Sequence, residues 1–282
     1  MSQIEIMQKR KSIRTFSADE LPDELVQSIR EYLGRNKSIA GPLGREGKAE
    51  FVRVTNNETD KGLKVGTYGF IKNPRAYLVG ICANEKDSLI DFGYGFHKLV
   101  LHVCSLGLGT CWMGGTFTRH SFERELSIPS GSFIPCVTPI GYPKENRRLF
   151  DKAVRAVVKS DNKKPWDKLF FDTSFEIPLI QENAGSFETP IEMVRLGPSA
   201  SNKQPWRLVV TDDRRTCHFF IEYTPNYSAS LGYNMQLLDI GIAMCQFELA
   251  CEELGIKGSW AKVNPGLEVP NVHTEYIASW VM

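Results

Sequence analysis

The chain has 282 residues, 42% of them apolar, and a formal net charge of +1. The apolar content suffices for a large core, and the length suits two halves close to the usual size of a domain. The charge is nearly balanced and contains no long basic run, so it provides neither an electrostatic footprint for nucleic acid nor a polybasic patch for a membrane surface.

The sequence indicates neither secretion nor membrane insertion. Residues 1–10 are polar and lack the apolar core of a signal peptide, and no window reaches the roughly eighteen apolar residues that a membrane span needs. The seven cysteines form an odd set without a C-x-x-C pair, mostly in apolar stretches, which is typical of reduced core residues. We expect a cytoplasmic protein with neither a nucleic-acid nor a membrane partner.

The first predicted elements are a helix and two strands. Ser17 is the expected N-cap of the helix, with Glu20 three residues later and apolar residues then at helical spacing. Residues 41–47 are predicted as a loop and residues 50–55 as an alternating strand. Residues 76–82 form a continuous apolar run, which favours a buried strand.

The most regular helical pattern covers residues 91–106, where Phe92, Phe96, Leu99 and Val103 share a face and Gly107 follows as a stop. Residues 133–142 are predicted as a strand. Residues 144–164 are highly charged and join the two parts of the chain; a solvated linker helix accounts for them most simply.

The second part repeats this mixture. It is predicted to contain a helix around residues 190–195, strands at 207–212 and 217–223, a long helix at 239–254 that stops at Gly255, and a short strand at 276–280. Both parts mix helices with strands, so the predicted fold class is α+β around an antiparallel or mixed sheet.

Sequence spacing indicates that the two parts are copies of one another. Gly41-Pro42 and Val54-Thr55 recur at a constant offset of 156 as Gly197-Pro198 and Val210-Thr211. A second set recurs at an offset of 148, in which Asp91, Gly93, Leu101, Leu106, Gly107 and Trp112 correspond to Asp239, Gly241, Leu249, Leu254, Gly255 and Trp260. Two long copies favour a fused dimer over a repeat array. The predicted halves are residues 1–155 and 156–282, which together would form one composite unit.

Each half carries one polar motif that the other lacks. In the first half Arg10, Ser12 and Arg14 alternate, so an extended segment would direct all three to one side, beside Lys11. Two guanidinium groups and a hydroxyl suit a phosphate. A solvated, basic N-terminal segment is the simpler alternative.

The motif of the second half is Pro198-Ser199-Ala200-Ser201-Asn202, whose small side chains would let a planar ligand approach the backbone. Local turn hydrogen bonds are the alternative explanation. The glycines between Gly107 and Gly115 follow a helix rather than opening one, so they are no dinucleotide fingerprint. The five histidines show no metal-ligand spacing, and no nucleophile elbow or Walker loop occurs. No metal site is therefore expected.

Together, four motifs resemble the nitroreductase family of flavoproteins: residues 10–16 (RKSIRTF), 197–206 (GPSASNKQPW), 106–115 (LGLGTCWMGG) and 140–143 (IGYP). The chain resembles most the subgroup in which two nitroreductase-like halves are fused in one polypeptide. Because nitroreductases bind FMN between two subunits, the resemblance implies that both halves of this chain contribute to one flavin site. A monomer, as a pseudo-dimer, would then be competent, and further homo-oligomerisation stays open.

The resemblance also assigns roles to residues. Arg10, Lys11, Ser12 and Arg14 would hold the phosphate and ribityl chain of FMN, and Pro198, Ser199, Ala200, Ser201, Asn202 and Gln204 would edge the isoalloxazine ring. Met113, Gly114 and Gly115 would cover the ring. Lys163 or Lys164 would be a further phosphate ligand, although the arginine that the family has in this stretch is absent. The reciprocal pairing of residues 166–171 with residues 43–47 lacks the family pattern and is expected to form no site.

The implied activity is an FMN-dependent oxidoreductase that passes hydride from NADH or NADPH to an electron-poor acceptor such as a nitroaromatic or a quinone. No catalytic side chain is predicted, because the cofactor carries the chemistry. Residues 57–67 and 224–233 could act as lids, as in specialised branches of the family. The alternatives are an FMN-binding storage or sensing protein with little turnover and a structural pseudo-dimer without a ligand.

Overall fold

A computed structural model of the chain describes residues 1–35, 39–54, 70–144 and 162–282. The chain divides into two compact units. We call Lys9–Val158 the N-terminal unit, and Met1–Gln8 together with Lys159–Met282 the C-terminal unit. The first residues of the chain thus belong to the same unit as its last residues.

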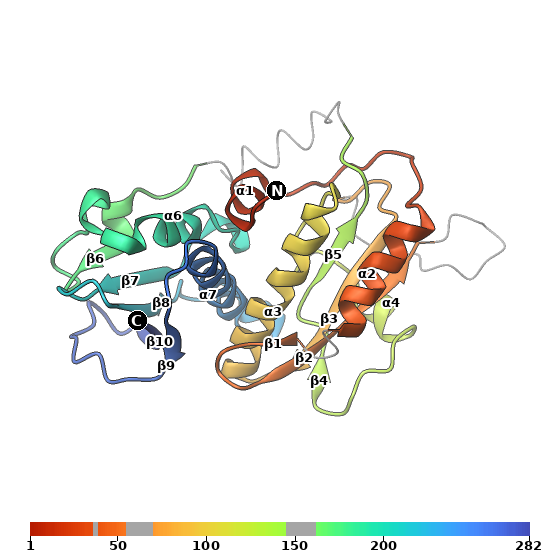
Figure 1. Cartoon of the computed structure of the whole chain (residues 1–282). Helices are drawn as coiled ribbons and strands as arrows, with labels where there is room; N and C mark the ends of the chain where they lie inside the picture. Colours follow the sequence, from red (N-terminus) through yellow and green to blue (C-terminus); the bar gives the residue numbers. More distant parts are fainter. Residues whose placement is uncertain (36–38, 55–69, 145–161) are drawn as a thin grey trace. The chain divides into compact units, whose positions relative to one another are not determined.

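The sheet of the N-terminal unit is antiparallel. Its strands run in the order β1-β2-β3-β4, and β5 pairs with β3. Helices α2, α3 and α4 belong to this unit (Figure 1). The bounds are α2 Asp23–Arg35, β1 Ile39–Ala40, β2 Glu46–Arg53, β3 Ala76–Ala83, α3 Lys86–Ser105, α4 Arg119–Glu123, β4 Ser132–Phe133 and β5 Val137–Ile140.

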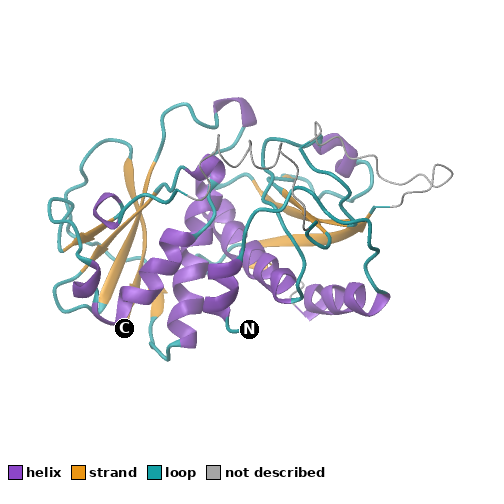
Figure 2. Cartoon of the chain, turned by 90° about the horizontal axis from the view of Figure 1, so that it is seen from above, coloured by secondary structure: helices purple, strands orange, loops and turns teal. Residues whose placement is uncertain are grey.

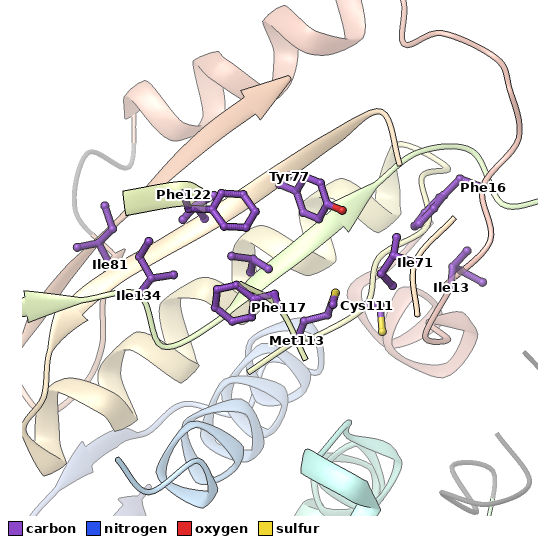
Figure 3. Close-up of a cluster of buried hydrophobic side chains, with 12 residues drawn as sticks. Ile13, Phe16, Ile71, Tyr77, Ile81, Cys111, Met113, Phe117, Phe122 and Ile134 are labelled. Carbon is purple, nitrogen blue, oxygen red and sulfur yellow. The ribbon is translucent and has the colours of Figure 1, made fainter. Parts of the chain in front are cut away.

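Strand β3 is buried on both faces, as its continuous apolar run predicts. Gly80 lies against Phe92 and Phe96 of α3, so a side chain at this position would overlap the helix. On the opposite face, Tyr77 and the residues that alternate with it join a cluster of buried apolar side chains, shown in Figure 3. Within this cluster the rings of Tyr77 and Phe122 pack edge to face, with their centroids 5.4 Å apart.

The sheet of the C-terminal unit is mixed, in the order β6-β7-β8-β10-β9; among its described strands β6 and β7 pair in parallel and the other neighbours pair antiparallel. Helices α6 and α7 pack against each other, and α7 also contacts β7 and β8 (Figures 1 and 2). The bounds are α1 Gln3–Lys9, β6 Phe170–Asp172, α6 Glu188–Leu196, β7 Trp206–Val210, β8 Thr216–Glu222, α7 Gln236–Glu253, β9 Ser259–Ala261 and β10 Thr274–Val281. Short 3-10 turns cover Trp166–Lys168, Gln181–Asn183, Gly185–Phe187, Ala200–Asn202 and Ala229–Leu231.

Both long helices end as the glycines predict. Gly107 and Gly255 follow α3 and α7 with φ angles of +80° and +71°, a left-handed conformation that glycine adopts without steric cost. Both helices begin earlier than the sequence pattern indicates, at Lys86 and Gln236.

The start of helix α2 corrects the prediction that Ser17 is its N-cap. The helix begins at Asp23, and the carbonyl of Pro22 accepts the hydrogen bonds of the first turn from Leu25 and Val26. Proline disfavours the helical conformation of the residue before it, so the helix cannot extend back through Leu21. Ser17 instead donates its backbone N–H to Tyr142.

The seven cysteines, all among the described residues, are free thiols, and six of them are buried. This agrees with the expectation of reduced core residues. In the part of the chain that the structure covers, no helix is both long and apolar enough to cross a bilayer.

Candidate functional site

The segment around Ser12 is extended, as the motif predicts, and is fixed by backbone hydrogen bonds. Ser12 forms a parallel bridge with Thr110, and the N–H of Ile13 donates to the Thr110 carbonyl at 2.8 Å. The Arg14 carbonyl accepts from the N–H of Lys72, also at 2.8 Å. Ile13 points into the apolar cluster, so its neighbours Ser12 and Arg14 are directed away from the cluster.

Arg10 and Arg14 each hold one guanidinium nitrogen, Nη1, that is buried and has no hydrogen-bond partner among the described residues. Burial lowers the pKa of Arg10 from its ordinary value, the Cys104 and Cys111 thiols raise it, and the charge of Arg14 lowers it again. A buried cation without a partner is costly, and two neighbouring cations add repulsion. An anion would relieve both costs, which makes this segment a candidate anion site. Lys11, in contrast, is exposed.

His97 belongs to the same neighbourhood, although none of the candidate site motifs in the sequence includes it. The residue is fully buried on α3, and neither ring nitrogen has a partner among the described residues. Burial, and next the charge of Arg10, hold the pKa of His97 well below its ordinary value, so the ring is neutral. The centroid of its ring lies 6.0 Å from that of Trp112. His97 and Cys104 are two helical turns apart and share a face of α3, a spacing that could have indicated this role.

The glycine-rich segment after α3 is held by the strand that follows it in the sheet. The N–H of Gly109 donates to Gly141 at 2.8 Å, and Met113 exchanges backbone hydrogen bonds with Val137. The Met113 side chain is buried in the apolar cluster (Figure 3). Arg119 donates to the Gly114 carbonyl at 3.0 Å, and Gly115 is exposed. Only the backbone of Met113, with Gly114 and Gly115, is therefore available to cover a ligand.

The second predicted motif forms a strained loop in the C-terminal unit, which we call the 197–204 loop. Ser201, Asn202 and Gln204 have φ angles of 47°, 53° and 49°, in the left-handed region that few non-glycine residues adopt. Such strain persists only where surrounding contacts hold the backbone, and it often occurs at functional sites. Pro198, Ser199 and Ala200 open the loop and are half-buried.

Several side chains hold this loop. The Lys163 ammonium donates to the Gly197 carbonyl at 2.5 Å and to Asn202 Oδ1 at 3.3 Å. The N–H of Lys164 donates to Gln204 Oε1 at 3.0 Å, and the N–H of Gln204 donates to Ser199 Oγ at 2.9 Å. Lys163 thus supports the loop. Burial, and next the charge of Arg207, lower the pKa of Lys164 to about 8.

Asp239 of α7 lies beneath the start of the loop, and it too lies outside the candidate site motifs in the sequence. One carboxylate oxygen accepts the N–H of Ala200 at 2.9 Å, and the other is buried without a partner among the described residues. Burial raises the pKa of Asp239 to about 7, although the Ala200 hydrogen bond and the Lys163 charge act in the opposite direction.

Two residues of the reciprocal pairing described above, in the range 166–171, have structural roles. Trp166 donates its indole N–H to Glu192 at 2.9 Å, and Phe170 is fully buried in β6. The predicted lid at residues 57–67 lies outside the described residues, as does most of the charged segment 144–164. No group of histidine, cysteine and acidic side chains that could hold a metal occurs in the described ranges.

Comparisons with known proteins relate most of the chain to one family. A family model described as "Putative TM nitroreductase" matches residues 3–251. A curated protein of Methanothermobacter thermautotrophicus is 29% identical over 165 residues, which cover 54% of this chain and 84% of that protein. A relative from Archaeoglobus fulgidus is 25% identical over 161 residues, or 52% of this chain and 89% of the relative. Both are named "Putative NADH dehydrogenase/NAD(P)H nitroreductase".

A solved structure extends the similarity to the full chain. The crystal structure of a putative nitroreductase from Thermotoga maritima has a TM-score of 0.60 and 19% identity, and the match covers 100% of this chain and 94% of that one. At this identity the match establishes the fold. The chain therefore belongs to the "Putative TM nitroreductase" family of oxidoreductases and has the nitroreductase fold in two halves.

Proposed function

We propose that this protein is an FMN-dependent oxidoreductase that takes hydride from NADH or NADPH and delivers it to an electron-poor small molecule such as a nitroaromatic or a quinone. The names of the two curated relatives, which mention NADH and NAD(P)H, support the choice of reductant. The observation that carries the proposal is the pair of buried guanidinium nitrogens of Arg10 and Arg14, neither of which has a hydrogen-bond partner among the described residues.

The donors at this segment fit a terminal phosphate. Arginine offers planar donors that suit phosphate oxygens, and a charge-assisted hydrogen bond satisfies a buried guanidinium better than a neutral acceptor does. Neutral His97 adds one further N–H donor beside Arg10. FMN ends in one such phosphate, and the sequence lacks the glycine fingerprint that binds the adenine half of FAD.

The roles of the remaining residues follow from their chemistry. We propose that the backbone of Met113, Gly114 and Gly115 limits access of water to the ring. The residues Pro198, Ser199, Ala200, Ser201, Asn202 and Gln204 would edge the isoalloxazine ring. That both sets serve one flavin rests on the family resemblance. When bound, FMN supplies the hydride acceptor and donor, so the protein needs only to bind, orient and exclude water.

Absorption spectroscopy tests the proposal directly. The purified protein, with FMN added if necessary, should show flavin absorption and release FMN on denaturation. Anaerobic mixing with NADH and with NADPH should then bleach the flavin, and steady-state kinetics should be ping-pong because both substrates use the same flavin face. Binding of FMN without reduction by either nicotinamide would favour a storage or sensing protein. A protein that takes up no FMN would contradict the proposal.

A further inference from the structure

The duplication provides an internal comparison between Asp91 and Asp239. Each is buried near the start of the long helix of its half, and each accepts hydrogen bonds from the loop that opens with Gly-Pro. Asp91 uses both oxygens, for the N–H groups of Leu43 and Arg45 at 2.9 and 2.7 Å. Asp239 accepts a hydrogen bond with only one of its oxygens, from the N–H of Ala200. Its Oδ2 is buried and has no partner in the described chain.

The two loops have the same sequence spacing but different structures. Strand β2 begins at Glu46, five residues after Gly41, whereas β7 begins at Trp206, nine residues after Gly197. The first strand starts early because β1 pairs with it through Ile39 and Ala40. In the second half the residues before Gly197 belong to helix α6, so they cannot provide this partner strand. Residues 46–49 therefore belong to strand β2 in the first half, whereas the corresponding residues 202–205 of the second half lie before strand β7 and form a loop.

The loop in the second half has more backbone strain than the first loop. It contains the left-handed residues Ser201, Asn202 and Gln204, and the described part of the first loop has a positive φ only at Gly44. Two side chains donate hydrogen bonds to the middle of the loop: Lys163 to Asn202 Oδ1, and the Tyr227 hydroxyl to Ser201 Oγ at 2.8 Å. At its start the Ala200 N–H is fixed by Asp239.

We propose that Asp239 is a positioning residue of the flavin site: its hydrogen bond to Ala200 sets the conformation of the 197–204 loop, so that the loop meets the ring edge. This inference rests on the proposed function. The carboxylate would act through the loop backbone and would not touch the reacting atoms. Asp91, whose loop runs directly into a strand, serves stability alone.

Three variants isolate the hydrogen bond. Asp239→Ala removes the acceptor and Asp239→Asn keeps an oxygen for Ala200. Ala200→Pro removes the donor, and the proline Cδ atom displaces the Asp239 carboxylate from the position of the hydrogen bond. The backbone conformation admits proline at this position because Ser199 is already extended, with φ −144° and ψ 157°, and Ala200 opens a helical turn. Asp91→Asn is the matched control from the other half.

Hydrogen–deuterium exchange gives the readout without a ligand. We expect Asp239→Ala and Ala200→Pro to raise exchange in the peptide covering residues 199–205 at least tenfold, and Asp239→Asn to leave it near the wild-type rate. Wild-type exchange in Asp239→Ala would overturn the inference. A chain that fails to bind FMN, but shows this exchange pattern, would contradict the proposed function and support the role of Asp239 in the loop.

Flavin titration then tests the link to the site. The dissociation constant of FMN should rise about tenfold in Asp239→Ala and in Ala200→Pro, with no further rise in the double variant, because both remove one hydrogen bond. The absorption spectrum of the bound flavin should shift in both variants, whereas Asp239→Asn should keep the wild-type spectrum. Asp91→Asn should lower the unfolding temperature but leave the dissociation constant within twofold. Additive effects of the two variants, or an equal effect of Asp91→Asn, would refute a positioning role.

Discussion

At the scale of single residues, Arg14 carries the sharpest expectation. Its buried Nη1 has no partner in the described chain, so a phosphate would gain a charge-assisted hydrogen bond there. Replacing Arg14 by Ala removes an interaction of roughly 1.5–3 kcal/mol, and the affinity for FMN should fall by about one to two decades. Isothermal titration of the apoprotein measures this change.

Arg124→Ala is a suitable control because it removes an exposed arginine from the same unit. Its dissociation constant for FMN should stay at the wild-type value. If Arg14→Ala also binds FMN with wild-type affinity, Arg14 does not belong to the phosphate site.

Asp239 should give the stability of the protein a measurable pH dependence. Burial raises the pKa of Asp239 to about 7, so the folded state keeps a proton that the unfolded chain loses near pH 4. The folded state then binds more protons than the unfolded state between about pH 4 and pH 7, and its stability falls as the pH rises through this window. The contribution lost is on the order of 4 kcal/mol.

Urea unfolding of the wild type and of Asp239→Asn at several pH values between 4.5 and 8 tests this sign. The variant cannot titrate at this position, so its stability relative to the wild type should increase toward pH 8. Lys163 and Tyr227, whose charge or hydroxyl faces Asp239, are present in both proteins. Parallel stability curves would show that Asp239 titrates normally.

At the scale of elements, the loop between β1 and β2 depends on the absence of a side chain at Gly41. A Cβ atom there would overlap the backbone and carboxylate of Asp91 on α3. Since neither the helix backbone nor the bonded carboxylate can move cheaply, Gly41→Ala should destabilise the N-terminal unit by several kcal/mol, on the order of 3.

Gly34→Ala provides the opposite test in the same unit. Gly34 lies in α2, and nothing described lies within 4 Å of a Cβ added there. Alanine should stabilise the helix by roughly 0.5–1 kcal/mol. Thermal unfolding of both variants measures the contrast, and equal effects would contradict the packing argument at Gly41.

Helix α1 is an element of the C-terminal unit although it begins the chain. Ile6 and Met7 are buried, and the N–H of Ile4 donates to Glu253 at the end of α7. Ile6→Asp places an unpaired charge in this contact and should cost about 3 kcal/mol of unfolding free energy. Gln3→Asp, at an exposed position of the same helix, should change it by less than about 0.5 kcal/mol. Similar unfolding midpoints for the two variants would show that α1 does not contribute to the core.

At the scale of the whole molecule, the asymmetry of the halves predicts one FMN for each polypeptide. The positions that correspond to Arg10, Ser12 and Arg14 at the offset of 156 are Trp166, Lys168 and Phe170. Trp166 is bonded to Glu192 and Phe170 is part of the core, so neither can bind a phosphate. A spectrophotometric titration should therefore saturate at one equivalent, and saturation at two equivalents would contradict the argument from asymmetry.

The sequence by itself determined the features that depend on local signals. Helical periodicity and the following glycines located α3 and α7, a continuous apolar run located β3, and the constant offsets identified the duplication. The four motifs identified the family, which the family model confirms over residues 3–251. The periodicity, the glycines, the apolar run and each motif lie within short stretches, and the duplication is visible from spacing along the sequence, so no long-range contact is needed to interpret them.

Tertiary structure decided what depends on residues distant in sequence. Only the folded chain shows that α1 packs in the C-terminal unit, that His97 lies beside Arg10, and that the loops after Gly41 and Gly197 differ. The loop difference arises because β1 pairs with β2 in one half, whereas α6 occupies the corresponding stretch in the other. Pairing between strands and burial of a polar side chain are set by neighbours in space, and a local pattern contains no information about those neighbours.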